Sequence, residues 1–358
     1  MSIACRHAEG RDSQRRSVQK SRRRRRLFPP PIGDGWHRRR HGEGTGNEMT
    51  ELTVRVTGRR DEATGVFSLT LAAPDGSDLP PWAPGAHIDV EAGPVGARQY
   101  SLCGDPGRAD RWRVAILHEP AGRGGSAHLF ATAHPGTTLR VSHPRNNFEL
   151  AAAGEYVFVA GGIGITPILP MLGEARAAGR PATLYYGART RSHLAFTDEL
   201  GAGPRVRLFP QDEAGLLPVA GLFEAHPGAT VYCCGPEPLL AAVEAEGARV
   251  GTEVRVERFA ARPGAAAAPT GEFEIRLART GRTLRVAADR SIVDVLESAG
   301  VPVITSCREG TCGSCETPVL GGAVDHRDSL LTEAERAAGA TMMLCVSRAR
   351  SRELVLDL

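Results

Sequence analysis

The spacing of four cysteines constrains this chain more than any other feature. The segment SCREGTCGSC places Cys307, Cys312 and Cys315 within nine positions, and Cys345 follows in MMLCVSRA. This pattern, C-x4-C-x2-C and then one distant cysteine, is that of a plant-type [2Fe–2S] site. Four thiolates must surround two irons, so a short loop can supply three of them while a distant strand brings the fourth.

Two glycines in this segment favour a tightly curled loop, because Gly310 and Gly313 permit backbone angles that other residues avoid. The inward N–H groups of such a loop hydrogen-bond the sulfurs and help to set the reduction potential. Zinc and disulfides are the alternatives. Structural zinc usually takes paired C-x2-C motifs, and this sequence has one such pair. Disulfides suit a secreted chain, and we recognise no secretory signal.

Length and composition indicate a globular protein of two or three domains, since the chain has 358 residues with 41% hydrophobic and 24% charged positions. Glycines and prolines interrupt the longest apolar stretch, residues 156–172, so we expect no membrane span. We therefore expect a cytoplasmic protein.

Charge is unevenly distributed along the chain. Residues 1–48 carry a balance of +8 and the remainder −5, and 43 of the 44 basic residues are arginine. The arginine bias runs through the whole chain, so the arginine run near the N-terminus is weak evidence for a nucleic-acid partner. We expect residues 1–48 to be a disordered basic extension, because they combine charge blocks, Pro and Gly without periodicity.

The pattern of apolar residues predicts three folded domains. Residues 49–150 read as short alternating strands with Gly/Pro turns, which favours an antiparallel β-barrel. Residues 151–262 alternate strands with helices, which favours a parallel α/β domain. Small residues and proline at 263–270 indicate a linker. Residues 271–358 open with a hairpin and a helix that Ser291 can cap, and they contain the cysteine loop.

A glycine-rich turn joins an apolar strand to a helix in YVFVAGGIGITPILPM. Gly162 and Gly164 would let the backbone approach a phosphate at the helix N-terminus, although Pro167 replaces the third glycine of the usual dinucleotide fingerprint. A tight turn without a ligand is the alternative. A second strand-to-helix junction, VYCCGPEPLL, contains Cys233, which we expect to be buried, and Cys234, which we expect to face the loop.

Two motifs in the predicted barrel suit a phosphorylated ring system. In RQYS, Arg98 offers a bidentate fork to a phosphate, Tyr100 a flat apolar face and Ser101 a hydroxyl for a ring nitrogen. The segment GRGGSAHLF, residues 122–130, adds a glycine turn ahead of a helix, which again suits phosphate.

In their order, these motifs resemble the ferredoxin–NADP reductase superfamily, and the C-terminal cysteine pattern together with GRGGS narrows the resemblance. The chain is similar to the phthalate dioxygenase reductase and vanillate demethylase reductase family over about residues 50–358. The resemblance implies a flavin-binding barrel, a nucleotide-binding α/β domain and a β-grasp ferredoxin domain. It also implies FMN as the flavin, with FAD as the alternative of the wider superfamily.

The resemblance assigns roles to individual residues. Ser101 and Cys234 are the residues we expect to act in catalysis. Arg98 would hold the FMN phosphate with the amides of Gly124, Gly125 and Ser126; Tyr100 and Ser101 would contact the ring; Gly162, Gly164 and Thr166 would line the nucleotide groove; Cys234 and Gly235 would lie by the nicotinamide; and Phe259 would close the domain beside the flavin.

These residues together predict an electron relay. A nicotinamide gives up two electrons as a hydride and an iron–sulfur cluster accepts one at a time, so a flavin belongs between them. The family mostly uses NADH, whereas Arg189 and Arg191 would suit the 2′-phosphate of NADPH. A Rieske centre needs both a C-x-H and a C-x2-H pair, and this sequence lacks the second, so a separate oxygenase must accept the electrons.

Three other functions remain open at this point. The acceptor could be a cytochrome P450 or another protein instead of a Rieske-type oxygenase. The chain could be a redox sensor that binds a cluster without turnover, or a zinc-binding interaction module. We expect a monomer.

Overall fold

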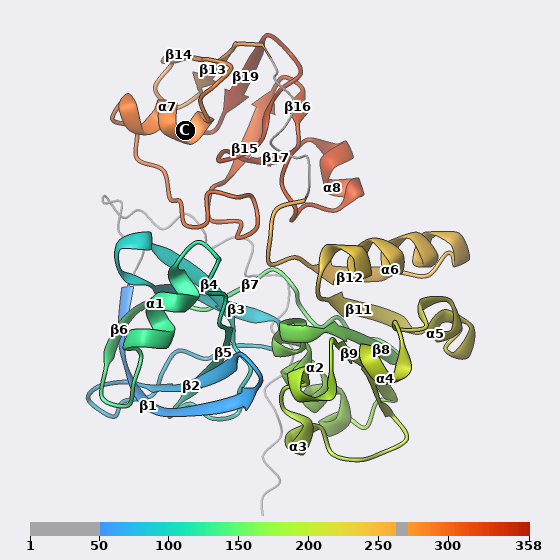
Figure 1. The fold of residues 1–358 in the computed structure, drawn as a ribbon. Coiled ribbons are helices and arrows are strands. Elements are labelled where there is room, and N and C mark those ends of the chain that lie inside the picture. The colour runs from blue at the N-terminus through green and yellow to red at the C-terminus, as the bar shows by residue number, and fades with distance from the viewer. Residues whose placement is uncertain (1–50, 263–270) are drawn as a thin grey trace, which may run out of the picture. The chain divides into compact units, whose positions relative to one another are not determined.

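In the computed structural model, the described residues are 51–262 and 271–358, and the predictions made for residues 1–48 and 263–270 lie outside them (Figure 1). The first part of the described chain is an antiparallel sheet with strand order β4-β3-β6-β1-β2-β5, and β7 pairs with β3. A bridge between Leu102 and Val114 joins the two edges of this sheet. Its elements are β1 (Glu51–Ala63), β2 (Val66–Ala72), β3 (Ala86–Glu91), β4 (Ala97–Ser101), β5 (Trp112–Leu117), α1 (Gly125–Thr132), β6 (Thr138–Ser142) and β7 (Arg145–Asn146).

Alternating side chains build the core of this sheet. In β1, Val54 and Val56 are buried while Thr53, Arg55 and Thr57 between and beside them are exposed, as the two-residue period of a strand requires. The buried valines belong to one apolar cluster with Phe67 and Leu69 of β2 and Trp112 of β5. Burying each such side chain contributes about 1.5–3 kcal/mol.

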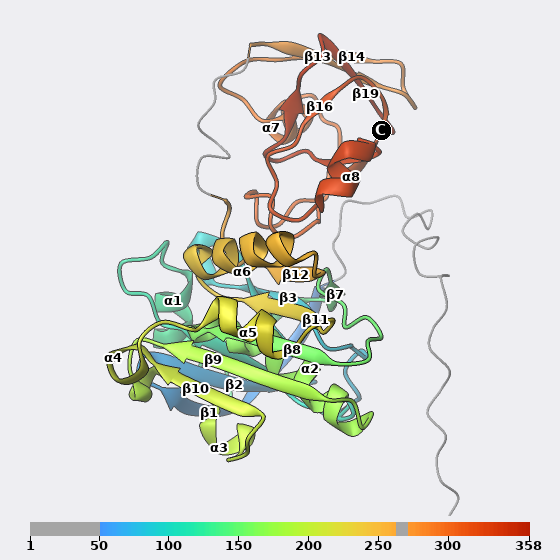
Figure 2. The ribbon, with the colours of Figure 1, turned by 90° about the vertical axis from the view of Figure 1, so that its right-hand side faces the viewer.

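The second part is a parallel sheet with strand order β10-β9-β8-β11-β12. Every residue of β8 is buried, because helices cover both faces of the sheet (Figures 1 and 2). Phe158 of β8 packs with α2, and its neighbour Val159 packs with α5 and α6 on the other face. The elements are β8 (Tyr156–Gly161), α2 (Ile165–Ala177), β9 (Ala182–Ala188), α3 (Thr197–Leu200), β10 (Val206–Pro210), α4 (Gln211–Ala214), α5 (Val219–Ala225), β11 (Thr230–Cys234), α6 (Glu237–Val250) and β12 (Val254–Glu257).

The third part, residues 271–358, is a mixed sheet with strand order β14-β13-β19-β15-β17, beside the short pair β16-β18. Ser291 caps α7 as predicted, since its hydroxyl accepts a hydrogen bond from the N–H of Asp294 at 3.1 Å. The elements are β13 (Phe273–Leu277), β14 (Thr283–Val286), α7 (Ile292–Ser298), β15 (Glu316–Gly321), β16 (Val324–Asp325), α8 (Glu333–Ala338), β17 (Thr341–Met343), β18 (Arg348–Ala349) and β19 (Glu353–Leu356).

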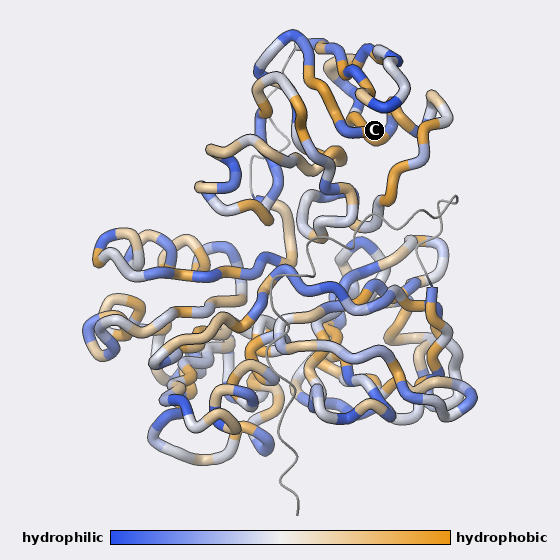
Figure 3. The backbone as a smooth tube through the Cα atoms, turned by 180° about the vertical axis from the view of Figure 1, so that it is seen from behind, coloured by the Kyte–Doolittle hydropathy of each residue, from blue (hydrophilic) through white to orange (hydrophobic). Residues whose placement is uncertain are grey.

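Figure 3 shows hydrophobic segments along the buried strands and hydrophilic segments at many of the turns. Helix α6 mixes both kinds, because Leu240, Val243 and Gly247 face the sheet while the residues between them are partly or fully exposed. Among the helices of the described residues, none is long and apolar enough to cross a bilayer.

Candidate functional site

The cluster loop, residues 306–315, carries three of the four predicted ligands, and Cys345 follows the end of β17. The four thiols lie close together, since Cys307 interacts with Cys312 and Cys345, and Cys345 also interacts with Cys315. Thiol donation from Cys312 and Cys345 holds the pKa of Cys307 far below its usual range. Within the described residues, no three or more His, Cys, Asp or Glu side chains converge as tightly as a single metal ion requires.

Backbone geometry explains the glycines of the cluster loop. Gly310 has φ +70°, and a Cβ there would lie 2.6 Å from Cγ2 of Val346 and 3.0 Å from Cα of Asp328. Gly313 has φ +74°. Two amides already point at sulfurs, since the N–H groups of Glu309 and Ser314 donate to Cys307 and Cys312, each at 3.4 Å. The donor set therefore fits a thiolate-held cluster.

Arg98 lies beside the turn before α1, where the sequence predicts a phosphate, and one of its guanidinium nitrogens donates to the carbonyl of Ala97 at 2.8 Å. Gly124 adopts a left-handed conformation with φ +89°, and Gly125 begins α1, whose first turn has no side-chain cap. A Cβ on Gly125 would lie 2.6 Å from Cγ of Arg98, so only glycine lets the helix N-terminus approach this arginine. The hydroxyl of Ser126 accepts a hydrogen bond from the N–H of Glu119 at 3.1 Å, which fixes the turn. Within the described part of the chain no side chain caps the first turn of α1, and such amides together with a guanidinium suit a phosphate.

The two predicted nucleotide turns lie against each other. A Cβ on Gly164 would lie 2.2 Å from the carbonyl oxygen of Cys234, and one on Gly235 would lie 3.0 Å from Cα of Gly161. Both glycines are therefore needed for the close approach of the β8–α2 turn to the β11–α6 turn. The hydroxyl of Thr166 donates to the carbonyl of Ile163 at 3.0 Å and tightens the first of these turns. Carboxyl ends of adjacent parallel strands are where such sheets bind nucleotides.

The expectation that Cys234 faces a loop is wrong. Cys234 is the last residue of β11 and is fully buried, like its neighbour Cys233. Burial raises the pKa of Cys234 well above the ordinary thiol value. The protonated thiol donates to Oε2 of Glu257 at 4.0 Å, a long and weak contact.

Glu257, at the end of β12, is a residue that the sequence analysis missed. Its side chain is partly accessible through a cavity, but protein surrounds the carboxyl group, and this desolvation raises its pKa to about 8. The next residue, Arg258, is buried, and its Nε donates to Glu237 of α6 at 2.9 Å. A further bond joins Arg258 to Glu244 of the same helix at 2.5 Å. These ion pairs fix the strand end that carries Glu257 and Phe259.

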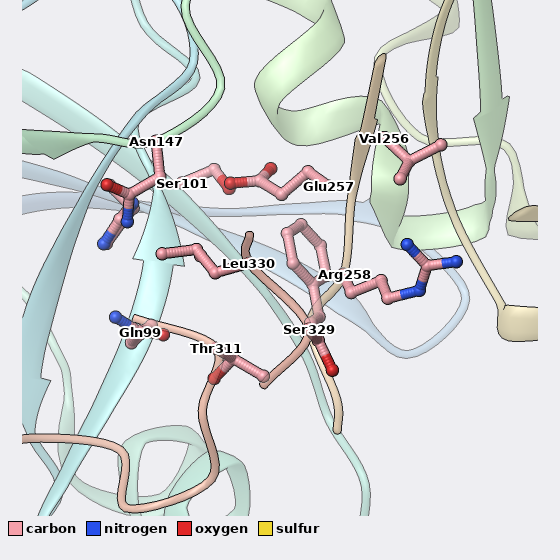
Figure 4. Close-up of a pocket in the computed structure, with 11 residues that line it drawn as sticks. Gln99, Ser101, Asn147, Val256, Glu257, Arg258, Thr311, Ser329 and Leu330 are labelled. Carbon is pink, nitrogen blue, oxygen red and sulfur yellow. The ribbon is translucent and has the colours of Figure 1, made fainter. Parts of the chain in front are cut away.

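The cavity into which Glu257 projects, called here the strand-end cavity, collects residues from distant parts of the chain (Figure 4). Figure 4 shows Ser101 and Glu257 pointing toward each other across it, while Arg258 points away. Phe259 lines the cavity and remains 44% exposed. The lining residues are His87, Gln99, Ser101, Asn147, Val256–Phe259, Thr311, Ser329 and Leu330.

Several polar atoms at this cavity fit a polar ring. Among the described residues, Oγ of Ser101, Nε2 of Gln99 and Nε2 of His87 are buried without a hydrogen-bond partner. Such atoms cost stability unless a ligand or water satisfies them. Tyr100 is on the same strand, and burial raises its pKa to about 12, so its phenol stays neutral. Ser101 and Tyr100 belong to the RQYS motif and were predicted from it, whereas no role was predicted for Gln99 of the same motif or for His87.

Contacts also join the cluster loop to the rest of the described chain. Nδ2 of Asn147 donates to the carbonyl of Cys312 at 3.0 Å, and Arg123 forms an ion pair with Glu309. Thr311, between the cysteines, lines the strand-end cavity. The predicted flavin strand, nucleotide strand and cluster loop therefore border one cavity.

The chain matches one protein-family model and is similar to known proteins over most of its length. The family model described as a 2Fe-2S iron-sulfur cluster binding domain matches residues 275–350. The phenoxybenzoate dioxygenase subunit beta of Ectopseudomonas oleovorans is 45% identical over 317 residues, which cover 87% of this chain and 98% of that protein.

Two solved structures are similar over 86% of the chain. One is phthalate dioxygenase reductase, described as a modular structure for electron transfer from pyridine nucleotides to [2Fe–2S], with 38% identity, a TM-score of 0.62 and 98% of its length covered. The other is an intact type IV self-sufficient cytochrome P450 monooxygenase, with 42% identity and a TM-score of 0.81. This chain spans 41% of that monooxygenase.

Proposed function

This chain belongs to the phthalate dioxygenase reductase and vanillate O-demethylase reductase family, and from that premise we propose that it passes electrons from NADH through FMN to a [2Fe–2S] cluster and on to a separate oxygenase. The protein is an oxidoreductase with a C-terminal iron–sulfur domain. The observation that carries the proposal is the strand-end cavity, which Ser101, Glu257 and Thr311 border from the three predicted domains.

The proposed domains keep the predicted boundaries: a flavin-binding β-barrel over residues 49–150, a nucleotide-binding domain over 151–262 and a β-grasp ferredoxin domain over 271–358. The bridge between the edges of the first sheet supports the barrel. The parallel strand order of the second sheet supports the nucleotide domain.

In the proposed site, Arg98 and the amides of Gly124, Gly125 and Ser126 bind the flavin phosphate, and Tyr100 offers its ring face to the isoalloxazine. The bound flavin supplies the conversion between a two-electron hydride and single electrons. The chain's task is placement and the exclusion of water. Ser101 offers a hydroxyl to the ring edge that gains charge on reduction. The thiols of Cys307, Cys312, Cys315 and Cys345 hold the cluster.

On the nucleotide side, Gly162, Gly164 and Thr166 line the proposed groove, with Cys234 and Gly235 beside the nicotinamide. Glu257 holds a proton at its carboxyl group near neutral pH, since its pKa is about 8, and it faces Ser101 across the cavity (Figure 4). Phe259 covers the opening. The neutral Glu257 carboxylic acid thus places no negative charge against an arriving hydride donor.

We propose NADH rather than NADPH as the donor. Arg191, which could have bound a 2′-phosphate, is held by Glu213 through bonds of 3.1 Å and 2.5 Å. The carboxylate of Glu213 neutralises this arginine and would repel a phosphate placed beside it. A free 2′-hydroxyl meets no such charge.

We propose a Rieske-type oxygenase as the acceptor and a monomeric reductase. The likeness to the oxygenase reductases named above supports the first part. The likeness to part of a self-sufficient cytochrome P450 favours a second candidate acceptor, a P450 haem protein. Mixing the reduced protein with each acceptor and following cluster reoxidation by absorbance would separate the two.

The proposal is tested by the visible spectrum of the purified protein and an anaerobic titration with NADH, then NADPH. We expect absorption from flavin and cluster, bleaching by NADH, and one flavin and two irons per chain. A protein that neither contains flavin nor binds added FMN would refute the relay. Preference for NADPH would change the donor alone.

A further inference from the structure

His87 is the most deeply buried polar side chain at the strand-end cavity that belongs to none of the motifs described above. Only 5% of the residue is exposed, and within the described part of the chain its Nε2 atom is buried without a hydrogen-bond partner. A buried polar atom left in this state destabilises the fold unless a ligand or water satisfies it. His87 lines the same cavity as Ser101 and Gln99, and within the described residues Oγ of Ser101 and Nε2 of Gln99 are also buried without a hydrogen-bond partner.

Strand register explains why these atoms gather. In the antiparallel pair β3–β4, His87 lies directly opposite Ser101, and Asp89 lies opposite Gln99. Because side chains alternate between the two faces of a sheet, these four residues share one face. Arg98 and Tyr100 alternate with these residues along β4 and so belong to its opposite face. His87 therefore adds a second strand to the surface that β4 presents to the cavity.

Burial, assisted by one neighbouring positive charge, keeps the imidazole of His87 neutral. Burial and then the guanidinium of Arg145, its register neighbour on β7, lower the pKa of His87 to about 4. Asp89 and Cys307 act in the opposite direction. Arg145 is already bound to Asp89 at 2.8 Å, so the acid is engaged elsewhere. A neutral imidazole presents one N–H donor and one acceptor nitrogen.

We propose that His87 binds the flavin ring directly, with Nε2 hydrogen-bonded to the polar pyrimidine edge of the isoalloxazine and the amide of Gln99 beside it. That edge alternates carbonyl oxygens with ring nitrogens, so it can satisfy an imidazole nitrogen, an amide NH2 and a hydroxyl at once. This inference rests on the proposed flavin site. It makes His87 a cofactor-binding residue that orients the ring, in addition to the Arg98-Tyr100-Ser101 motif.

The test compares His87→Leu with His87→Asn in the full-length protein. Leucine fills a similar volume without a polar atom, whereas asparagine keeps a donor and an acceptor. After removal of the flavin, FMN is titrated back and its fluorescence quenching gives the dissociation constant. We expect H87L to weaken FMN binding about tenfold and to alter the shape of the visible flavin bands, and H87N to recover most of both.

Ser142→Ala is the matched control. Ser142 is buried on β6, and its hydroxyl accepts from the N–H of Asp89 at 2.9 Å, one strand away from the cavity lining. This variant loses a buried hydrogen bond of the same sheet without touching the cavity, so we expect unchanged FMN affinity and flavin bands. A loss in S142A equal to that in H87L would mean that His87 acts through the sheet alone, and would overturn the inference.

Failure of the inference and failure of the flavin site are distinguishable. Wild-type protein that does not bind FMN refutes the proposed function, whereas wild-type protein that binds FMN with an affinity and spectrum equal to those of H87L refutes only the role of His87. If H87L does not fold, the 15N spectrum of histidine-labelled wild-type protein decides. The His87 Nε2 resonance is assigned as the one that is missing from the spectrum of H87N. We expect addition of FMN to shift this resonance in the wild-type protein, and a resonance that does not move overturns the inference.

Discussion

The protonated state of Glu257 makes the stability of this protein depend on pH in a direction opposite to that of an ordinary carboxylate. The substitution Glu257→Gln tests this, because it keeps the shape of the side chain and replaces the titrating carboxyl group with an amide. In the folded protein the pKa is raised to about 8 by desolvation, against an ordinary value of 4.5. Folded protein therefore holds a proton that unfolded protein has released.

Proton linkage gives the direction and the size of the pH effect of Glu257 on the free energy of unfolding. Stability falls with rising pH wherever the folded state binds more protons than the unfolded state. The contribution is complete below the unfolded pKa of 4.5 and is lost as pH rises through the folded value of about 8. At about 1.4 kcal/mol for each pKa unit, the wild type should lose up to about 3 kcal/mol more than E257Q between pH 5 and pH 8. Water entering the cavity lowers this figure.

The assay is urea unfolding of the full-length protein at several pH values between 5 and 8, with the wild type and E257Q measured side by side. The difference between their unfolding midpoints should grow with pH in favour of E257Q. Glu253→Gln is the control, because Glu253 precedes the same strand but its side chain is 61% exposed. If the unfolding midpoints of the wild type and E257Q change equally with pH across this range, the carboxyl group of Glu257 is not protonated in the folded protein and the reasoning is refuted.

Other predictions follow from single contacts. Cys345→Ala removes the distant thiolate, so the purified protein should lose the cluster's visible absorption and most of its iron while flavin binding persists. Arg98→Leu removes the charge opposite the phosphate, so FMN affinity should fall about 10- to 100-fold, with little change in the affinity for riboflavin, which lacks the phosphate. Glu213→Gln frees Arg191 from its carboxylate, so the preference for NADH over NADPH, measured as a ratio of kcat/KM values, should fall about tenfold.

The cysteine site could be predicted from the sequence because the ligand spacing is itself a covalent property of the chain. Cys307, Cys312 and Cys315 cannot lie far apart on so short a loop, and β17, which pairs with the β15 strand that follows the loop, brings Cys345 back to them. The glycine turns were predictable for a similar reason. Gly125 and Gly164 mark close approaches that a Cβ would block, at 2.6 Å and 2.2 Å.

The residues that the sequence could not reveal depend on register and burial. His87 faces the cavity because β3 pairs with β4 in one register, and a shift by one residue would turn it to the opposite face. Cys234 was expected to face the loop, yet it is buried at the end of β11, a strand that lies between β8 and β12. Glu257 stands two positions before Phe259, which the family resemblance identified, but nothing local indicates that its carboxyl group is desolvated.

A common cause connects these missed residues with the proposed mechanism. A relay between a hydride donor, a ring and an iron–sulfur cluster requires no charged acid–base pair, and among the described residues the one carboxyl group that lines the strand-end cavity, that of Glu257, is desolvated. The cavity instead keeps two polar groups neutral by enclosing them, the imidazole of His87 and the carboxylic acid of Glu257. The thiol of Cys234, buried in the core next to Glu257, is neutral for the same reason. Neutrality of this kind arises from desolvation by neighbouring strands, and it therefore becomes visible only when the fold brings those strands together.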